Sequence, residues 1–160
     1  MFNLFKKEQS LMFVSPTSGQ VVPITEVKDD VFSQGILGVG YAVKPSEDDF
    51  FAPVDGVIEA IFPTKHAMTF KTKNGIEMLL HLGIDTVDLK GAPFKILVNA
   101  GQNVQAGEML GSMDRKQIKL AGKDDTILII FTNKDKIATF PTSPVQAIGH
   151  GDSFGKVVLK

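Results

Sequence analysis

The 160-residue chain contains no cysteine. It therefore has no disulfide, no thiolate zinc site and no cysteine nucleophile, and its composition fits a reducing compartment. A formal net charge of −1 and the lack of an arginine-rich patch argue against nucleic acid as a partner. No apolar run reaches the length of a membrane span, and no signal peptide is evident. We expect a soluble, cytoplasmic protein.

Hydrophobic residues make up 43% of the chain and charged residues 22%, the proportions of an ordinary globular protein. A chain of this length predicts one domain with a sizeable core. The first ten residues mix apolar side chains with two lysines. We therefore expect a flexible tail over residues 1–14 and a single domain over residues 15–160.

Short β-type runs broken by Gly, Pro, Asn and Asp fill most of the chain, which predicts an all-β fold. The expected architecture is an antiparallel β-sandwich, or a hybrid of barrel and sandwich, with at most one or two short helices. A helix is expected over residues 115–121, with Asp114 as its N-cap and Gly122 at its end. Strands are predicted near residues 11–14, 20–25, 40–43, 57–62, 67–72, 76–82, 94–98, 108–112, 127–131, 145–148 and 156–159.

A turn pattern that leads into a strand occurs twice along the chain. Pro16–Val21 and Pro53–Ile58 both read Pro-x-x-Gly-x-aliphatic. The repeat predicts an internal duplication.

Residues 75–87 form an apolar run that carries His81 in the middle of a predicted strand. A buried imidazole at such a position needs a hydrogen-bond partner or a chemical role. Asn74-Gly75 is a strong hairpin signal, and pairing of residues 70–72 with residues 76–78 would bring His66 level with His81. Neutral imidazole is a good nucleophile toward phosphorus, so one histidine can attack while the other neutralises charge.

Other interpretations of the histidines remain open at this point. His81 could be a core histidine bonded to a carbonyl, and His66 a half-exposed turn residue. A metal site would need three or four ligands, and neither His-x-His nor His-Glu-x-x-His spacing occurs. The chain has no Gly-x-Ser-x-Gly elbow, and the glycine-rich residues 35–40 lack the ending of a Walker loop. We expect no metal and no cofactor, and read His150 as a surface turn residue.

The stretch Gly75 to Val87 closely resembles the phosphorylation-site signature of enzyme IIA of the glucose family, from the bacterial phosphoenolpyruvate-dependent sugar phosphotransferase system. The resemblance covers the chain from about Ser15 to its end. Its further motifs are Val31-Phe32-Ser33, Gly38-x-Gly40-x-Ala42, Lys44-Pro45, Ala52-Pro53-Val54-Asp55-Gly56, Thr64-x-His66-Ala67, Leu89-Lys90-Gly91 and Gly101-x-x-Val104-x-x-Gly107.

The resemblance implies roles for five residues. His81 would be phosphorylated on Nε2, and His66 would be the second active-site histidine, facing the phosphoryl group. The His81 Nδ1 would donate to the Gly83 carbonyl, and the His66 Nδ1 would face the Thr64 hydroxyl. Asp85 matches an aspartate that meets arginines on partner proteins.

The docking surface departs from the family pattern at one position, because Val39 stands where some members have a second aspartate. Transient docking requires an apolar depression around the histidines rather than a deep cleft. We expect it to be lined by Val39, Phe70, Leu79 and Leu82.

The implied function is that of a phosphohistidine carrier. It would accept a phosphoryl group from the histidine-containing phosphocarrier protein (HPr) on His81 and pass it to a cysteine of a sugar-specific IIB domain. Without cysteine or a spanning segment, this chain cannot contain the IIB function or the IIC permease, so it would meet the membrane only through its permease partner. One alternative is a regulatory module whose phosphorylation state gates permeases or kinases. Another is a zinc-dependent hydrolase on a similar β scaffold, and a zinc ion shared by both histidines and a partner carboxylate remains open.

Overall fold

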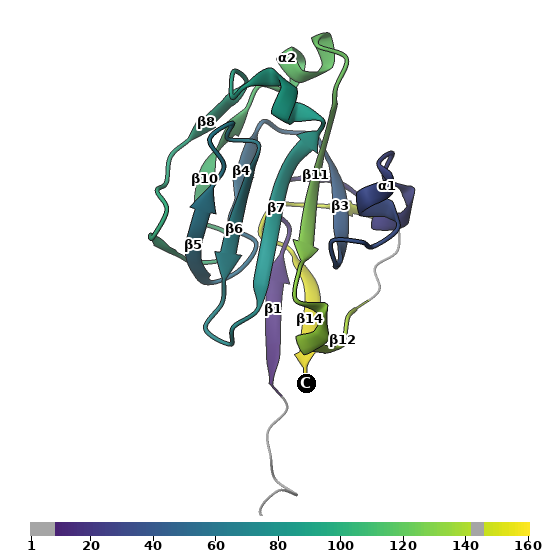
Figure 1. The fold of residues 1–160 in the computed structure, drawn as a ribbon, viewed down its shortest axis with the longest axis vertical. Coiled ribbons are helices and arrows are strands. Elements are labelled where there is room, and N and C mark those ends of the chain that lie inside the picture. The colour runs from purple at the N-terminus through teal and green to yellow at the C-terminus, as the bar shows by residue number, and fades with distance from the viewer. Residues whose placement is uncertain (1–8, 142–145) are drawn as a thin grey trace, which may run out of the picture.

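The computed structural model describes residues 9–141 and 146–160, which fold into antiparallel β-sheets (Figure 1). An eight-stranded sheet has the order β13-β2-β3-β11-β7-β6-β5-β9, and two three-stranded sheets have the orders β4-β10-β8 and β1-β14-β12. Within the described residues no helix has the length and apolar character needed to cross a membrane. The all-β prediction is confirmed.

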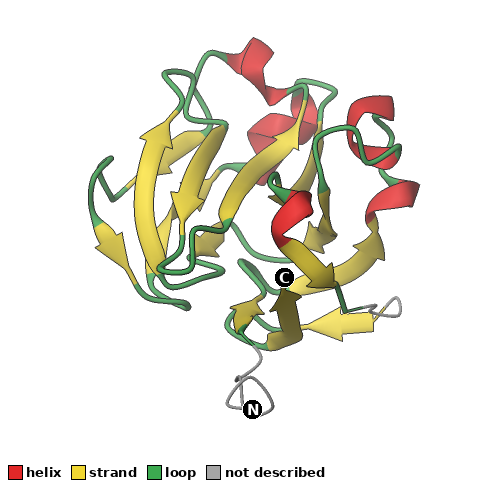
Figure 2. Cartoon of the chain, turned by 60° about the horizontal axis from the view of Figure 1, so that its bottom comes forward, coloured by secondary structure: helices red, strands yellow, loops and turns green. Residues whose placement is uncertain are grey.

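The elements are mostly short, as the spacing of turn residues predicts. The strands are β1 (Ser10–Val14), β2 (Gly19–Pro23), β3 (Val39–Pro45), β4 (Asp49–Phe51), β5 (Gly56–Ile61), β6 (Ala67–Lys71), β7 (Glu77–Ile84), β8 (Phe94–Ile96), β9 (Asn103–Val104), β10 (Met109–Met113), β11 (Asp124–Phe131), β12 (Ile137–Thr139), β13 (Gln146–Ile148) and β14 (Ser153–Leu159). The helices are α1 (Asp30–Ser33) and α2 (Arg115–Leu120), with 3-10 turns η2 (Ile24–Glu26), η3 (Thr86–Leu89) and η4 (Lys134–Lys136). Figure 2 shows how small this helical content is beside the strands.

The two helices differ in how readily the sequence predicts them. Helix α2 lies where it was expected, and the Asp114 side chain caps it by accepting from the Gln117 backbone N–H. Helix α1 was missed because four residues are too few to show a helical period. Its N-cap is Asp29, whose side chain accepts from the Val31 backbone N–H. Strands β4, β9 and β12 were also missed, since each has only two or three residues.

The predicted hairpin forms with the predicted register. Phe70 lies opposite Met78, and Gly75 closes the turn by donating its N–H to the Thr72 carbonyl. Strand β7 then pairs with β11 on its other edge, so that it lies in the middle of the large sheet (Figure 1).

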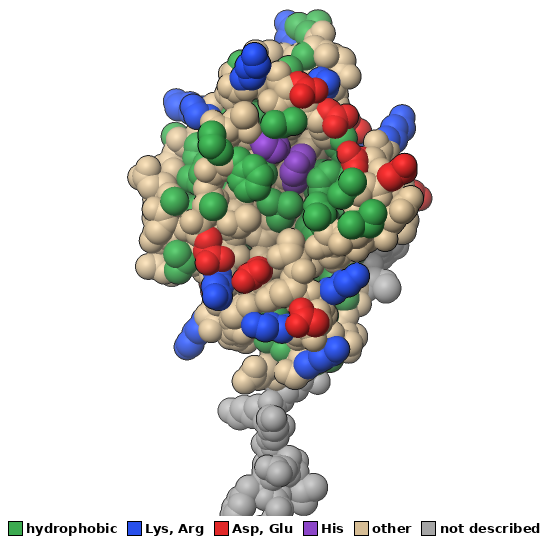
Figure 3. Space-filling model, in the orientation of Figure 1, with side chains coloured by type: hydrophobic (Ala, Val, Ile, Leu, Met, Phe, Trp, Pro, Cys, Tyr) green, Lys and Arg blue, Asp and Glu red, His purple; other side chains and the backbone are tan. Residues whose placement is uncertain are grey.

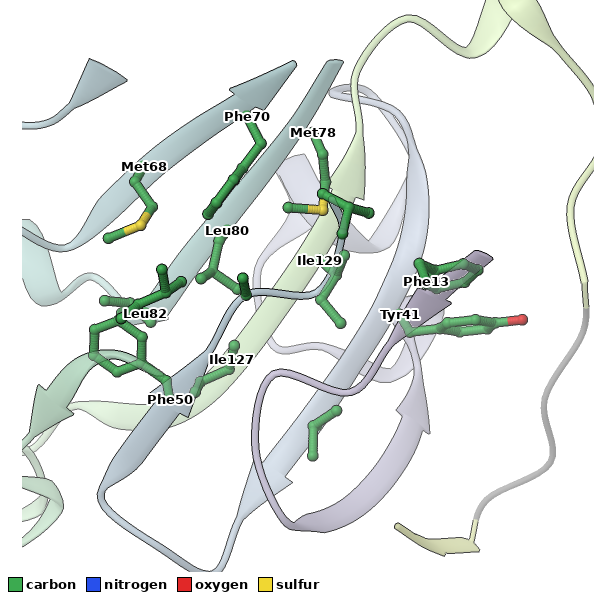
Figure 4. Packing of buried hydrophobic residues seen from close by; sticks show 14 of the residues in the cluster. Phe13, Tyr41, Phe50, Met68, Phe70, Met78, Leu80, Leu82, Ile127 and Ile129 are labelled. Atoms are coloured by element: carbon green, nitrogen blue, oxygen red, sulfur yellow. The ribbon is translucent and has the colours of Figure 1, made fainter. Parts of the chain in front are cut away.

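Strand β7 is buried on its inner face and partly covered on its outer face, which fits its nearly continuous apolar sequence. On the inner face Met78, Leu80 and Leu82 belong to the main core cluster, together with residues of β6 and β11 (Figure 4). The outer face lies under a smaller cluster, whose buried members are Val22, Val27, Phe32, Ala42, Ile84, Leu128 and Ile130.

The expected internal duplication stays a prediction. Both Pro-x-x-Gly segments lead into strands of the large sheet, with Gly19 as the first residue of β2 and Gly56 as the first residue of β5.

The expected tail boundary at residue 14 is wrong. Ser10–Val14 forms strand β1, which pairs with β14. The Phe13 ring is fully buried and lies 5.1 Å from the Phe131 ring and 5.2 Å from the Phe154 ring. A strand was predicted near residues 11–14, so the error lies in assigning these residues to a flexible tail instead of to the domain. Residues 1–8 of the expected tail lie outside the described residues.

Truncation of Phe13 tests whether this strand belongs to the domain. We expect Phe13→Ala to lower the free energy of unfolding by roughly 3–5 kcal/mol, because it empties a packed aromatic site. The neighbouring Met12 is 57% exposed, so Met12→Ala is the matched control and should change stability by less than about 0.5 kcal/mol. Chemical denaturation measures both, and equal, small effects would mean that the segment behaves as a tail.

Candidate functional site

The two predicted histidines lie together on the outer face of the large sheet. His81 is in the middle of β7, opposite Ala67 of β6 and Leu128 of β11. His66 directly precedes β6, and its carbonyl oxygen accepts a hydrogen bond of 2.7 Å from the Leu82 N–H. The ring centroids are 5.1 Å apart and the ring planes are nearly perpendicular. Figure 3 shows both rings at the surface among hydrophobic side chains, so the hairpin brings the pair level as predicted.

A backbone carbonyl determines which nitrogen of His81 carries the proton. Its Nδ1 lies 2.7 Å from the Gly83 carbonyl oxygen. A carbonyl only accepts hydrogen bonds, so Nδ1 must donate, and in the neutral ring the lone pair is then on Nε2. The His66 Nδ1 lies 2.5 Å from the Thr64 hydroxyl, which can donate or accept. Both contacts that the resemblance implied are present.

The chain turns sharply after His81, and Gly83 makes that turn possible. Its φ is +80°, and a Cβ there would lie 2.5 Å from Thr86 Cγ2 and 2.8 Å from the Asp124 carbonyl oxygen. Only glycine fits this position without strain. Asp85 follows in the left-handed region at φ 60°, immediately before η3.

Burial keeps both imidazoles neutral near neutral pH. It is the largest influence on the pKa of His81, which it lowers, and the nearby His66 lowers it further. The Gly83 carbonyl and the carboxylates of Asp29 and Asp85 raise that pKa without reversing the shift. Burial also lowers the pKa of His66. A neutral ring with a free lone pair is the form that can act as a nucleophile.

An apolar rim surrounds the pair and was largely missed by the sequence analysis. The Phe32 ring of α1 contacts His81 at 4.9 Å, and the Phe62 ring contacts His66 edge-on at 5.3 Å. Exposed hydrophobic side chains of α1, of the loop after it, of the β5–β6 turn and of η3 form what we call the apolar rim: Val31, Ile36, Leu37, Phe62 and Val87. Because α1 and η3 were not predicted, their outward side chains gave no sequence signal.

Two of the four expected docking residues are wrong. Phe70 and Leu82 are fully buried in the inner core. Leu82 follows His81 directly in the strand, so the pleat turns its side chain to the opposite face. Val39 and Leu79 are only partly buried, and their part in docking stays a prediction.

In the described part of the chain, neither a metal cluster nor the third histidine joins the pair. Within residues 9–141 and 146–160 no group of three or more His, Cys, Asp or Glu side chains could hold a metal ion.

His150 lies between β13 and β14, where its Nδ1 is 2.8 Å from Glu47 and its ring stacks on Phe51. Burial tends to raise the pKa of Glu47, but hydrogen bonds from Ser18 and His150 outweigh burial and lower it. This second cluster is a surface contact between turns.

The lowered histidine pKa values can be tested by titration. Ring NMR signals of His81 and His66 should titrate with midpoints below the ordinary value of 6.5. The unfolded chain then takes up protons before the folded protein does. The free energy of unfolding should therefore be at its full value above pH 6.5 and fall as the pH drops toward the folded midpoints. A midpoint above 6.5 for His81 would contradict the dominance of burial.

Three comparisons with known proteins point to the same family. Residues 11–137 match the family described as phosphoenolpyruvate-dependent sugar phosphotransferase system, EIIA 1. The PTS system glucose-specific EIIA component of Staphylococcus epidermidis is 34% identical over 146 residues, which cover 91% of this chain and 88% of that protein. The PTS system glucose-specific EIICBA component of Streptococcus pneumoniae is 40% identical over 145 residues, which cover 91% of this chain but only 20% of the larger protein.

A solved structure, glucose permease IIA from Mycoplasma capricolum, has the same fold. It superposes with a TM-score of 0.82 and 37% sequence identity, over 97% of each chain.

Proposed function

The chain belongs to the EIIA 1 family of the phosphoenolpyruvate-dependent sugar phosphotransferase system, and from this membership we propose that it is a phosphohistidine carrier. It accepts a phosphoryl group from HPr on His81 and passes the group to a cysteine of a sugar-specific IIB domain. The observation that carries the proposal is the hydrogen bond from His81 Nδ1 to the Gly83 carbonyl, which leaves the Nε2 lone pair free. A cytoplasmic location, and contact with the membrane only through the permease, belong to the same proposal.

The transfer needs no proton to leave His81. The Nε2 lone pair attacks phosphorus on the donor phosphohistidine, so that one N–P bond forms as the other breaks and the donor ring regains its lone pair. In the second step a cysteine thiolate attacks, an S–P bond forms and Nε2 recovers its electrons. Throughout, Nδ1–H stays bonded to Gly83. Phosphoryl transfer depends mainly on in-line positioning and on stabilising the charge of the equatorial oxygens.

His66 supplies part of that charge stabilisation. If the Thr64 hydroxyl donates to its Nδ1, the ring proton is on Nε2, where it can donate to a phosphoryl oxygen on His81. The perpendicular rings and the centroid distance of 5.1 Å support this arrangement. Partner arginines and backbone amides would complete the site.

The surroundings of the pair suit a brief encounter with partners. The apolar rim supplies area that can be desolvated, and Asp85 supplies a negative charge beside it for a partner arginine. HPr and the IIB domain would use the same face in turn, because each must bring its own reacting atom to Nε2.

A regulatory function is the second candidate. Phosphorylation adds about −1.5 to −2 charges at pH 7, and here they would appear at the centre of the apolar rim. A permease or kinase that docks on this rim would therefore distinguish the two forms. A zinc-dependent hydrolase would need further ligands, which the described residues do not gather around the pair.

Mass analysis after incubation with phosphoenolpyruvate, enzyme I and HPr tests the carrier function. We expect one acid-labile phosphoryl group on the wild type and none on His81→Ala. His66→Ala should still accept the group but pass it to the IIB domain about 10²–10³-fold more slowly, as when one stabilising donor is removed. His150→Ala replaces the third of the three histidines and is the matched control, which should behave as the wild type does. Equal labelling of His81→Ala would refute the site assignment.

Replacement of Asp85 tests the charged part of docking. Asn tolerates the left-handed backbone at this position, so Asp85→Asn removes the charge with little change in the turn. The KM for phosphorylated HPr should rise several-fold with little change in kcat, and the effect should shrink at high salt. Asp88→Asn, which removes a carboxylate paired with Lys123, is the control. An equal effect of both substitutions would mean that HPr responds to the overall negative charge of this region rather than to a specific contact with Asp85.

A further inference from the structure

Backbone groups on either side of the Leu82–Gly83 peptide are bonded to the two histidines. The Leu82 N–H donates to the His66 carbonyl oxygen at 2.7 Å, and the following Gly83 carbonyl oxygen accepts from His81 Nδ1 at 2.7 Å. The orientation of the Leu82–Gly83 peptide therefore affects the separation of the two rings and the position of the His81 proton.

Strand pairing alone does not hold this peptide in place. The register between β7 and β11 shifts between Asp124 and Ile127, which lie opposite Ile84 and Leu82. The φ of +80° at Gly83 also departs from extended backbone. An additional contact is needed to fix the peptide at this irregularity.

Thr86 makes that contact. Its side chain is fully buried, and its hydroxyl donates to the Leu82 carbonyl oxygen at 2.5 Å. Its methyl group closes the space beside Gly83, where an added Cβ would lie 2.5 Å from Thr86 Cγ2. A buried hydroxyl with a backbone partner is expected to hold that backbone rigidly.

We propose that Thr86 is a positioning residue for the phosphoryl relay, which fixes the Leu82–Gly83 peptide so that the Gly83 carbonyl holds the proton of His81 on Nδ1. The relay itself rests on the proposed function, whereas the position of the proton does not. A peptide free to rotate would let the ring proton move to Nε2. Each molecule with the proton there has its lone pair on Nδ1, so Nε2 has none with which to attack phosphorus.

Two substitutions separate the hydroxyl from the shape of Thr86. Thr86→Val keeps the Cγ2 methyl group and replaces the hydroxyl donor by a second methyl, while Thr86→Ser keeps the donor and loses the methyl group. Thr72→Val is the matched control, because Thr72 is also buried and its hydroxyl accepts from the Ile76 N–H at the far end of the same hairpin. All three variants lose one buried contact of similar size, but only those at Thr86 touch the peptide beside His81.

The first measurement is the ¹⁵N shifts of the His81 ring, recorded well above pH 6.5 so that the ring is neutral. Wild type, Thr86→Ser and Thr72→Val should show a protonated Nδ1 and an unprotonated Nε2, whereas Thr86→Val should show exchange between the two tautomers. The phosphorylation rate at saturating HPr should fall about five- to ten-fold in Thr86→Val, the equivalent of one hydrogen bond, and less than about three-fold in the other two.

An unchanged His81 ring in Thr86→Val would overturn the proposal, and so would an equal effect in Thr72→Val. If Thr86→Val does not fold, Thr86→Ala and Thr86→Ser decide. The proposal then requires the wild-type tautomer in Thr86→Ser and exchange in Thr86→Ala, and equal behaviour of the two refutes it. Absence of any phosphoryl group on the wild type would refute the proposed function, while the ring signals still decide the role of Thr86.

Discussion

The hydrogen bond between His81 Nδ1 and the Gly83 carbonyl is the constraint on which the site depends. The His81 side chain must reach the carbonyl oxygen of Gly83, two residues further along the same strand. Regular β backbone does not bring these two groups within hydrogen-bond distance. Gly83 provides the needed turn through its positive φ, and the buried inner side chains of β7 hold the strand in the sheet while it turns. The large sheet thus provides a rigid support that keeps the ring proton of His81 on Nδ1.

Burial and charge act on the histidines in opposite directions, and burial prevails. The carboxylates of Asp29 and Asp85 favour a charged His81, yet removal of the ring from water has the larger effect on its pKa. The outcome suits a phosphoryl acceptor, because a protonated ring has no free lone pair. The same carboxylates remain near the surface, where they can act on a partner instead of on the ring.

Local patterns in the sequence predicted the strands, the hairpin register and the meeting of His66 with His81. They failed where tertiary contacts decide the outcome. Phe70 and Leu82 look like surface candidates beside the histidines, but the pleat places them in the core. Helix α1 is too short to leave a periodic signal. The strand at residues 11–14 was predicted, but its place in the domain depends on Phe13 packing against distant aromatic rings.

The pairing of β1 with β14 brings the first and last described strands side by side, and both outer ends lie at the lower end of the molecule in Figure 1. In the same orientation the histidines lie in the upper half (Figure 3). A linker attached at either terminus would therefore leave the reactive face unobstructed. Such a tether would turn an encounter between separate molecules into a search within one chain, at an effective concentration set by linker length. The same domain geometry is thus compatible with a freely diffusing protein and with a covalently attached module.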